Sequence, residues 1–214
     1  MDASFWHNRW QTNQTGWHER DVNPLLIAHF PSLNVPPGAR VFVPLCGKSL
    51  DLGWLLSRGY AVAGAELSEL AVTQLFAELG MEVHISEVGK FRLFRGERID
   101  IFVGDIFDLS REILGAVEAV YDRAALVALP EAMRVRYAAH LKAITGMAPQ
   151  LVIGYEYDQT VLEGPPFSVT PDELHRHYSD DYALTLLARV EIPGGLKGKC
   201  PATEHIWRLD KRPG

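Results

Sequence analysis

The 214-residue sequence has little that would suit a secreted, membrane-spanning or nucleic-acid-binding protein. Its two cysteines, Cys46 and Cys200, are too few and too far apart for a disulfide framework or a metal cluster. No apolar run approaches the ~20 residues that cross a bilayer, and the N-terminus has no apolar secretion core. The net charge of −6 lacks the basic excess of a nucleic-acid surface. We therefore expect a cytoplasmic protein with no metal site and no nucleic-acid or membrane partner.

Glycine is scarce in the turn after the first apolar strand. A P-loop needs a glycine five positions before Gly47, but Phe42 stands there inside the strand. The dinucleotide fingerprint needs three glycines, so that the backbone can approach a pyrophosphate, and residues 44–47 contain one. The turn therefore excludes a nucleoside triphosphate site, disfavours a dinucleotide and favours a nucleoside that lacks a pyrophosphate.

What the sequence does contain here is a strand, a turn, a helix and a second strand that ends in an acid. Residues 41–43 predict a buried strand, residues 50–57 a helix, and residues 61–65 a strand followed by Glu66. Glu66 follows Gly47 at close to the ~20-residue spacing at which an acid reaches ribose hydroxyls. A carboxylate there would accept hydrogen bonds from both hydroxyls and repel a 2′-phosphate. The simpler alternative is a solvated acid that caps the next helix.

Strands alternate with helices along the chain, which predicts a doubly wound, mostly parallel α/β sheet. We expect one domain, residues 1–214, with an N-terminal segment (1–30) before a core sheet (40–209). Residues 184–192 and 203–209 are expected to close a seven-stranded sheet as an antiparallel hairpin. The other expected elements are strands at 81–86, 99–103, 116–121 and 150–157, an inserted hairpin within 90–98, and helices at 23–30, 68–79 and 130–145.

Ligands of open α/β sheets bind at the carboxyl ends of the strands, so the residues expected there are the site candidates. In the turn at 104–107, Ile106 would contact a base, whereas Asp105 would either assist or merely cap the turn. Asp122 and Arg123 follow another apolar strand. Arg123 would lie near the methionine-like end of a cofactor or near an acceptor, and the simpler reading is an ion pair that holds the strand end.

Three of the five tryptophans, Trp6, Trp10 and Trp17, precede every expected core strand. They would either pack as core aromatics of an N-terminal helix or form a lid that excludes water from a reactive sulfonium. Within the group, Trp10 is favoured to reach the site.

Other reactive side chains favour structural roles. His175 and His177 have the spacing of a metal pair on a strand, but they lie in a helical pattern, so we expect surface histidines. Cys46 has no evident activating base and is expected to pack rather than to act as a nucleophile.

Five segments together resemble the thiopurine S-methyltransferase family, and its bacterial branch most closely. Residues 43–51 (VPLCGKSLD) are the most specific of them, because this turn replaces the glycine-rich turn of most class I methyltransferases. The other segments are 5–10 (FWHNRW), 64–68 (GAELS), 104–107 (GDIF) and 121–126 (YDRAAL). The resemblance implies a Rossmann-like class I fold and methyl transfer from S-adenosyl-L-methionine to aromatic or heterocyclic thiols, with selenium or tellurium compounds as further acceptors.

The resemblance also implies cofactor-binding positions, at Trp10, Leu45, Glu66 and Arg123, with Ile106 beside the adenine. It assigns no catalytic residue beyond a role for Arg123 in positioning the acceptor, since acidic heteroaromatic thiols make a general base optional. Two alternatives stay open: a non-catalytic adenosyl-cofactor sensor, and, disfavoured by the turn, a nicotinamide-dependent oxidoreductase. No clear exposed apolar stripe is evident, so we expect a monomer.

Overall fold

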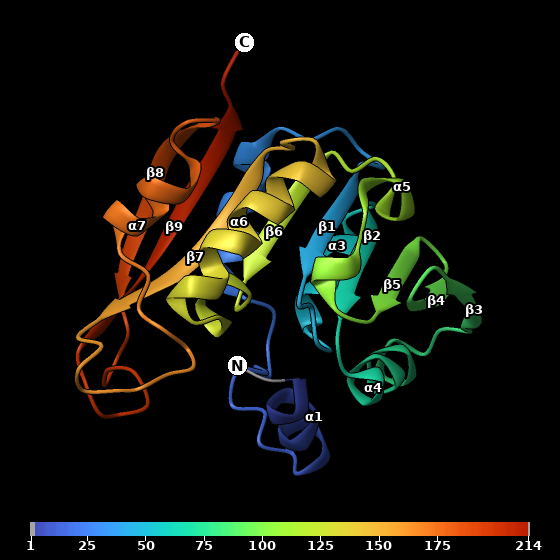
Figure 1. Cartoon of the computed structure of the whole chain (residues 1–214), viewed down its shortest axis with the longest axis horizontal. Helices are drawn as coiled ribbons and strands as arrows, with labels where there is room; N and C mark the ends of the chain where they lie inside the picture. The colour runs from blue at the N-terminus through green and yellow to red at the C-terminus, as the bar shows by residue number, and fades with distance from the viewer. Residues whose placement is uncertain (1–2, 214) are drawn as a thin grey trace.

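The computed structural model describes residues 3–213, and these contain one sheet of nine strands in the order β3-β4-β5-β2-β1-β6-β7-β9-β8 (Figure 1). Strands β5, β2, β1, β6 and β7 run parallel, while β9 and β8 continue the sheet in antiparallel pairing. The strands are β1 (Arg40–Pro44), β2 (Ala61–Glu66), β3 (His84–Val88), β4 (Phe91–Gly96), β5 (Ile99–Val103), β6 (Ala119–Arg123), β7 (Gln150–Tyr157), β8 (Tyr182–Glu191) and β9 (Ala202–Lys211).

The expected parallel sheet with a closing antiparallel hairpin is confirmed, and it spans the seven strands from β5 to β8. The two remaining strands, β3 and β4, extend its other edge. The predicted third strand at 81–86 lies at 84–88 instead, and the predicted hairpin within 90–98 is wrong. Residues 91–96 form one strand that pairs with both β3 and β5. Turns at positive φ, Gly89 on one side and Arg98 on the other, define this meander.

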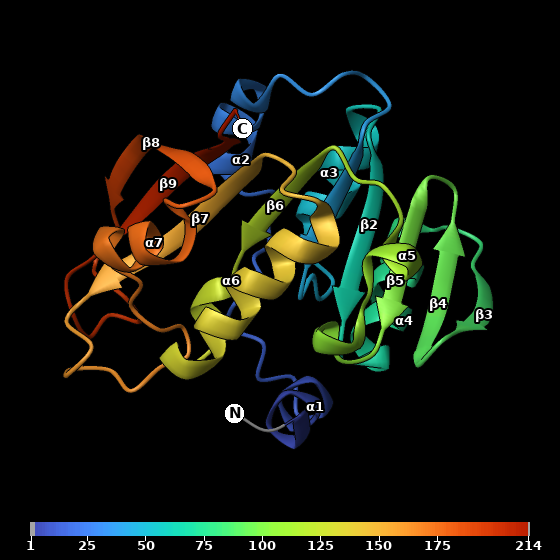
Figure 2. The ribbon, with the colours of Figure 1, turned by 45° about the horizontal axis from the view of Figure 1, so that its top comes forward.

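Helices cover both faces of the sheet (Figure 2). Apolar side chains of α2, α3 and α4 pack with one face, and those of α5, α6 and α7 pack with the other. The α-helices are α1 (Ala3–Gln11), α2 (Pro24–His29), α3 (Leu50–Ser57), α4 (Glu69–Leu79), α5 (Arg111–Leu114), α6 (Glu131–Thr145) and α7 (Pro171–Tyr178), and the 3₁₀ turns are η1 (Phe30–Leu33), η2 (Ile106–Asp108) and η3 (Leu126–Ala128).

Local signals place the first helices where the sequence predicts them. The Asn23 side chain accepts hydrogen bonds from two backbone N–H groups at the start of α2, and the Ser68 hydroxyl caps α4. Gly80 ends α4 in the left-handed conformation at φ +62°, which glycine adopts without strain. These caps satisfy backbone groups that a helix leaves unpaired at its ends.

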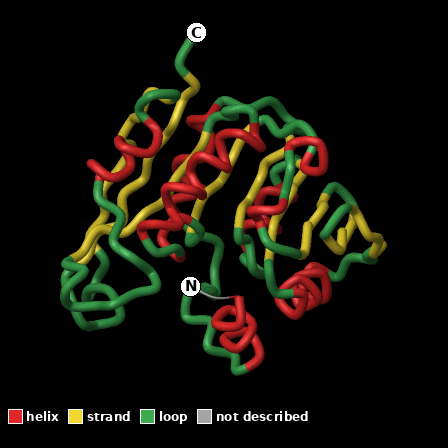
Figure 3. Tube along the Cα trace, viewed as in Figure 1, coloured by secondary structure: helices red, strands yellow, loops and turns green. Residues whose placement is uncertain are grey.

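The carboxyl ends of the parallel strands face α1 and the loops of one edge (Figures 1 and 3). Tertiary structure thus brings the N-terminal helix, the β1 and β2 turns and the end of β6 to one region. None of the helices among residues 3–213 is both long and apolar enough to span a membrane.

Candidate functional site

A cavity of about 500 Å³ lies at this edge of the sheet. Its volume falls within the ~300–1,000 Å³ of pockets that enclose small-molecule ligands. Each of the five residues singled out from the sequence lines it: Trp10, Leu45, Glu66, Ile106 and Arg123. These residues come from α1, the β1 turn, β2, η2 and β6, so only the folded chain brings them together.

The turn after β1 lines the cavity and has an unusual backbone conformation at two of its residues. Leu45 adopts φ +48° although it is not a glycine, a conformation that clusters at functional sites. Gly47 has φ +54°, and a Cβ atom there would lie 3.1 Å from the Trp10 ring. The turn therefore needs glycine at this position both for its backbone conformation and for the close approach of α1.

Glu66 ends β2 and is buried, with 6% of its surface exposed. Its Oε2 accepts a hydrogen bond from the Gly47 N–H at 2.9 Å, and its Oε1 accepts one from the Ser68 N–H at 2.7 Å. Burial raises the pKa of this carboxyl, and the backbone N–H groups partly offset that effect. A carboxylate has about four lone-pair sites, and the backbone groups of Gly47, Leu67 and Ser68 do not fill them all, so the carboxylate can still accept a donor from the cavity.

The turn after β5 contributes both of its candidate residues to the cavity lining. The exposed Asp105 side chain caps the turn, because its carboxylate accepts a hydrogen bond from the Phe107 N–H at 2.9 Å, while its contact with a base stays a prediction. Ile106 is buried in the cavity wall, and its carbonyl oxygen lies 2.8 Å from Nε2 of His140 on α6. That contact holds the backbone of Ile106 against α6.

Asp122 and Arg123 lie within β6 rather than after it, and the ion pair between them that their adjacency suggested is wrong. Neighbouring side chains of a strand point to opposite faces. The Asp122 carboxylate accepts hydrogen bonds from the Leu126 N–H and the Tyr137 hydroxyl, at 3.1 and 2.8 Å. Burial raises its pKa to about 6.

Arg123 instead points towards the cavity and the N-terminal segment. Its guanidinium forms an ion pair with Glu19 and lies 3.4 Å from the Trp17 carbonyl oxygen through Nη1. The side chain is 8% exposed, and its buried Nε has no hydrogen-bond partner among the described residues. Arg123 therefore ties the segment after α1 to the end of β6 and keeps one donor for a ligand.

The N-terminal tryptophans line the cavity as a group. The Trp6 and Trp17 rings meet edge to face with centroids 5.3 Å apart, and the Trp10 and Trp17 rings do so at 5.8 Å. Trp10 is 5% exposed, yet it belongs to none of the core clusters of the described residues. This placement favours a cover over the cavity rather than part of the central core.

Several cavity residues were missed by the sequence reasoning. Tyr121 donates a hydrogen bond to Asp51 Oδ2 at 2.9 Å, and Asp51 Oδ1 accepts one from the Asn23 N–H at 2.8 Å. Asp51 lies in the turn-and-helix motif and could have been noticed there. The sequence does not indicate that Tyr155, on β7, lines the cavity, because a tyrosine inside an apolar strand is typical of a buried core residue.

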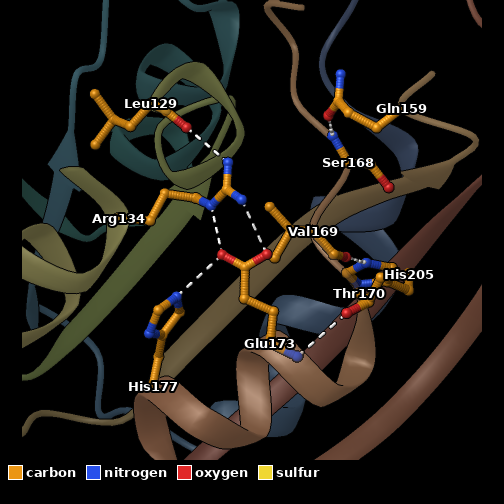
Figure 4. Close-up of polar contacts among 9 residues, drawn as sticks. All are labelled: Leu129, Arg134, Gln159, Ser168, Val169, Thr170, Glu173, His177 and His205. Atoms are coloured by element: carbon orange, nitrogen blue, oxygen red, sulfur yellow. Dashed lines mark hydrogen bonds and ion pairs between the residues drawn. The ribbon is translucent and has the colours of Figure 1, made fainter. Parts of the chain in front are cut away.

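Leu129 and Met133 form another part of the cavity lining. The backbone of Leu129 is held by Arg134, which forms a buried ion pair with Glu173 (Figure 4). Arg134 Nε and Nη2 donate to the Glu173 carboxylate at 2.5 and 2.9 Å, while Nη1 donates to the Leu129 carbonyl at 2.8 Å. Glu173 also lies 3.1 Å from His177 Nε2. A two-pronged pairing of this kind restricts α6 and α7 geometrically.

His177 is therefore not the surface histidine that was expected, since its side chain is only 7% exposed. The neighbouring His175 is exposed, as predicted. The two differ because the amphipathic helix α7 turns His177 towards Glu173, one helical turn earlier. Among residues 3–213 no group of three or more potential ligands could hold a metal ion.

Cys46 is buried beside Gly64, whose Cβ, if present, would lie 2.8 Å from the cysteine sulfur. Burial, with the nearby Glu66, raises the pKa of its thiol well above the ordinary value. A protonated, buried thiol is a poor nucleophile, so the expected packing role is consistent with this environment.

Comparison with solved structures shows the fold. The Burkholderia thailandensis 1,6-didemethyltoxoflavin-N1-methyltransferase, solved with its substrate and S-adenosylhomocysteine, aligns with TM-score 0.65 at 16% identity, over 98% of this chain and 87% of that one. The Synechocystis magnesium protoporphyrin IX methyltransferase with bound S-adenosylhomocysteine aligns with TM-score 0.63 at 14% identity, over 98% and 100%. The chain therefore has a methyltransferase fold.

Comparison of sequences shows the family. Thiopurine S-methyltransferase of Xanthobacter autotrophicus is 55% identical over 212 residues, which cover 99% of this chain and 100% of that protein. The corresponding protein of Teredinibacter turnerae is 51% identical over 211 residues, covering 99% and 98%. The sequence model of thiopurine S-methyltransferases matches residues 1–207. This chain therefore belongs to the thiopurine S-methyltransferase family.

Proposed function

We propose that this protein transfers a methyl group from S-adenosyl-L-methionine to the sulfur of thiopurines and of other aromatic or heterocyclic thiols. Relatives at 55% and 51% identity over nearly the whole chain bear the name thiopurine S-methyltransferase. The single observation that carries the proposal is Glu66, a buried carboxylate at the cavity wall that backbone N–H groups hold in place and that can accept a further donor. Such an acceptor suits the hydroxyls of a ribose.

The rest of the cavity fits the same cofactor. The apolar side chains of Leu45 and Ile106 would flank the adenine, and Glu66 would hold the ribose. The unpartnered Nε of Arg123 would donate to the carboxylate of the methionine portion, and Trp10 would cover it. A buried donor without a partner is costly unless a ligand supplies the acceptor.

The residues of the chain contribute to methyl transfer mainly by placement. When bound, S-adenosylmethionine supplies a methyl group that its positively charged sulfur already activates. The cavity would hold the acceptor sulfur in line with that methyl carbon, which removes several kcal/mol of the barrier. The tryptophan cover would exclude water, and Arg123 would keep its charge at every working pH.

A methyl-transfer assay with labelled cofactor tests the proposal. The acceptors are 6-mercaptopurine, thiophenol, selenite and tellurite, and labelled thioether from the first two is the expected result. Arg123→Lys should reduce transfer because lysine lacks the fork and the Nε donor, whereas the matched Arg92→Lys, at an exposed ion pair with Glu69, should not. Transfer to selenite or tellurite would extend the acceptor class to those elements.

Negative outcomes separate the rival functions. Binding of S-adenosylhomocysteine with no transfer to any acceptor would refute the enzyme and support an adenosyl-cofactor sensor. Binding of NADH in place of S-adenosylhomocysteine would support a nicotinamide-dependent oxidoreductase. Both titrations use the same protein sample, so a failed assay is not mistaken for a damaged preparation.

We also propose that the chain acts as a monomer. The large apolar residues exposed in the structure are spread over several elements, with at most two on any one of them: Ile27, Leu50, Leu70, Val83, Ile85, Val135, Val161, Leu186 and Val190. Light scattering should give the mass of one chain, 23.9 kDa. A dimer mass at micromolar concentration would refute this.

A further inference from the structure

Tyr155 and Glu204 face each other directly across the β7–β9 ladder. Side chains at opposed positions of antiparallel strands lie on the same face, about 5 Å apart at Cβ. Tyr155 lines the cavity, whereas Glu204 is not among the residues that line it. Each of the two side chains shifts the pKa of the other, and they are cross-strand neighbours, so the phenol stands between the cavity and a half-buried carboxylate.

The charged neighbours of this pair come from two directions. Arg123, on β6, and Glu19, in the segment after α1, both interact electrostatically with Glu204 and with Tyr155. On the β8 side the residue opposite Glu204 is the uncharged Val190. Burial raises the pKa of Glu204, while Tyr155 and then Arg123 partly offset it.

The pKa shifts of Tyr155 and Glu204 suit a proton donor and a proton acceptor, respectively, near neutral pH. Burial, with the charge of Glu204, raises the pKa of the Tyr155 phenol, which therefore stays protonated and can pass a proton on. A carboxyl whose pKa is shifted upwards is a better base near neutral pH than an ordinary glutamate. The arrangement is that of a phenol relaying protons from a cavity to a base behind it.

We propose that Tyr155 and Glu204 remove the proton of acceptor thiols that enter the cavity as S–H rather than as thiolate. This inference rests on the proposed methyl-transfer function. As the sulfur lone pair forms the new S–C bond and the C–S bond of the sulfonium breaks, the thiol proton passes to the Tyr155 oxygen. The phenol proton passes at the same time to the Glu204 carboxylate. The products are the thioether, S-adenosylhomocysteine and a protonated Glu204, which then loses its proton to solvent.

The consequence is a difference between classes of acceptor. Heteroaromatic and nitro-substituted thiols are acidic and arrive as thiolates, so they do not need the relay. Alkyl thiols with a pKa near that of free cysteine, about 8.5, arrive mostly protonated at pH 7 and do need it. The pair would therefore widen the range of thiols that this enzyme methylates at neutral pH.

The test compares two acceptors, 4-nitrothiophenol and phenylmethanethiol, with the full-length protein at pH 7. Glu204→Gln should lower kcat for phenylmethanethiol about 100-fold, the lower end of the contribution expected of a general base, and leave 4-nitrothiophenol within twofold. Tyr155→Phe should show the same selective loss. The matched control is Glu191→Gln, an exposed carboxylate at the end of β8 on the same hairpin.

The pH profile gives a readout that a merely structural role would not move. In Glu204→Gln, kcat/KM for phenylmethanethiol should rise about tenfold per pH unit below pH 8, because only the thiolate then reacts. Wild type should rise far less steeply over this range, and Glu204→Asp should recover part of the activity at pH 7. Equal losses for both acceptors, or weaker binding of S-adenosylhomocysteine to Glu204→Gln, would overturn the relay and assign Glu204 to the support of Arg123.

The controls keep this test independent of the proposed function. No transfer by wild type to 4-nitrothiophenol or to phenylmethanethiol would mean that the proposed function itself fails, whereas transfer to 4-nitrothiophenol alone would overturn the relay. Transfer by wild type, with the acidic thiol alone insensitive to both substitutions, supports the relay. If Glu204→Gln does not fold, Tyr155→Phe decides, since it removes one hydroxyl and keeps the ring.

Discussion

Replacing Glu66 with glutamine isolates the role of a single charged oxygen at the centre of the site. In wild type, each carboxylate oxygen accepts one backbone N–H, from Gly47 or Ser68. The glutamine amide keeps one acceptor and turns an NH₂ group towards the other N–H, so one hydrogen bond to a charged group is lost, worth about 1.5–3 kcal/mol. The neutral amide also avoids the free-energy cost of burying a charge, the same cost that raises the pKa of Glu66.

These opposing effects leave a small net loss of stability. We expect Glu66→Gln to lower the free energy of unfolding by about 1 kcal/mol, a decrease in Tm of about 2–4 °C for a chain of this length. Binding of S-adenosylhomocysteine should weaken much more. One charge-assisted bond to the ribose, worth about 1.5–3 kcal/mol, corresponds to an approximately 10- to 100-fold larger Kd.

Isothermal titration with S-adenosylhomocysteine and with its 2′-deoxy analogue measures this. Wild type should prefer the ribose form, and Glu66→Gln should lose most of that preference; the exposed Glu87→Gln on β3 serves as the control. A Glu66→Gln protein with a lower Tm and an unchanged Kd for S-adenosylhomocysteine would refute the reasoning. Glu66 would then serve only the turn, as the capping alternative holds.

Three further substitutions test other parts of the structure. Burial raises the pKa of Asp122 to about 6, above the ~3.9 of an unfolded chain, so the native state binds more protons and stability falls as pH rises from about 4 to 6. Urea midpoints should show that wild type loses about 2–3 kcal/mol over this range relative to Asp122→Asn, and parallel curves would contradict the shift. Arg123→Ala should reduce kcat/KM at least about tenfold with little change in Tm, since its partner Glu19 is largely exposed; unchanged kinetics would remove Arg123 from the site. Gly47→Ala forces φ +54° on alanine and sets its Cβ 3.1 Å from Trp10, so unfolding should cost about 1–2 kcal/mol less and tryptophan emission should shift, while an unaltered spectrum would refute contact with the cover.

The unit at residues 41–66, a strand, turn, helix and second strand ending in Glu66, could be predicted from the sequence because its signals are mostly local. A short apolar run followed by a turn determines β1, and capping residues within the same few positions determine where α3 and α4 begin and end. The position of Glu66 at the end of β2 follows from the same run, as does its place at the edge of the sheet where ligands bind. Local hydrogen bonds decide the helix ends, and short buried apolar runs identify β1 and β2, although these strands pair with distant ones.

The edge strands and the facing of β6 could not be read in the same way. Residues 84–103 alternate between apolar and polar, a pattern that fits a hairpin or a meander equally well, and pairing with β2 decides between them. Asp122 and Arg123 look like a pair in sequence, but the pleat of the strand sends them to opposite faces. The expected strand ended at residue 121, whereas β6 ends at Arg123, and this difference of two residues made the predicted facing of Asp122 and Arg123 wrong.

Residues close together in the chain specify the alternating α/β plan, the glycine-poor turn and the acid that follows it. What surrounds that acid depends instead on the folded arrangement of distant segments. Folding brings Trp10 onto Gly47, joins Arg123 to Glu19, and sets Tyr155 opposite Glu204 across β7 and β9. These contacts depend on how the sheet orders its strands and on how the chain ends return to it, and no local pattern of residues specifies that.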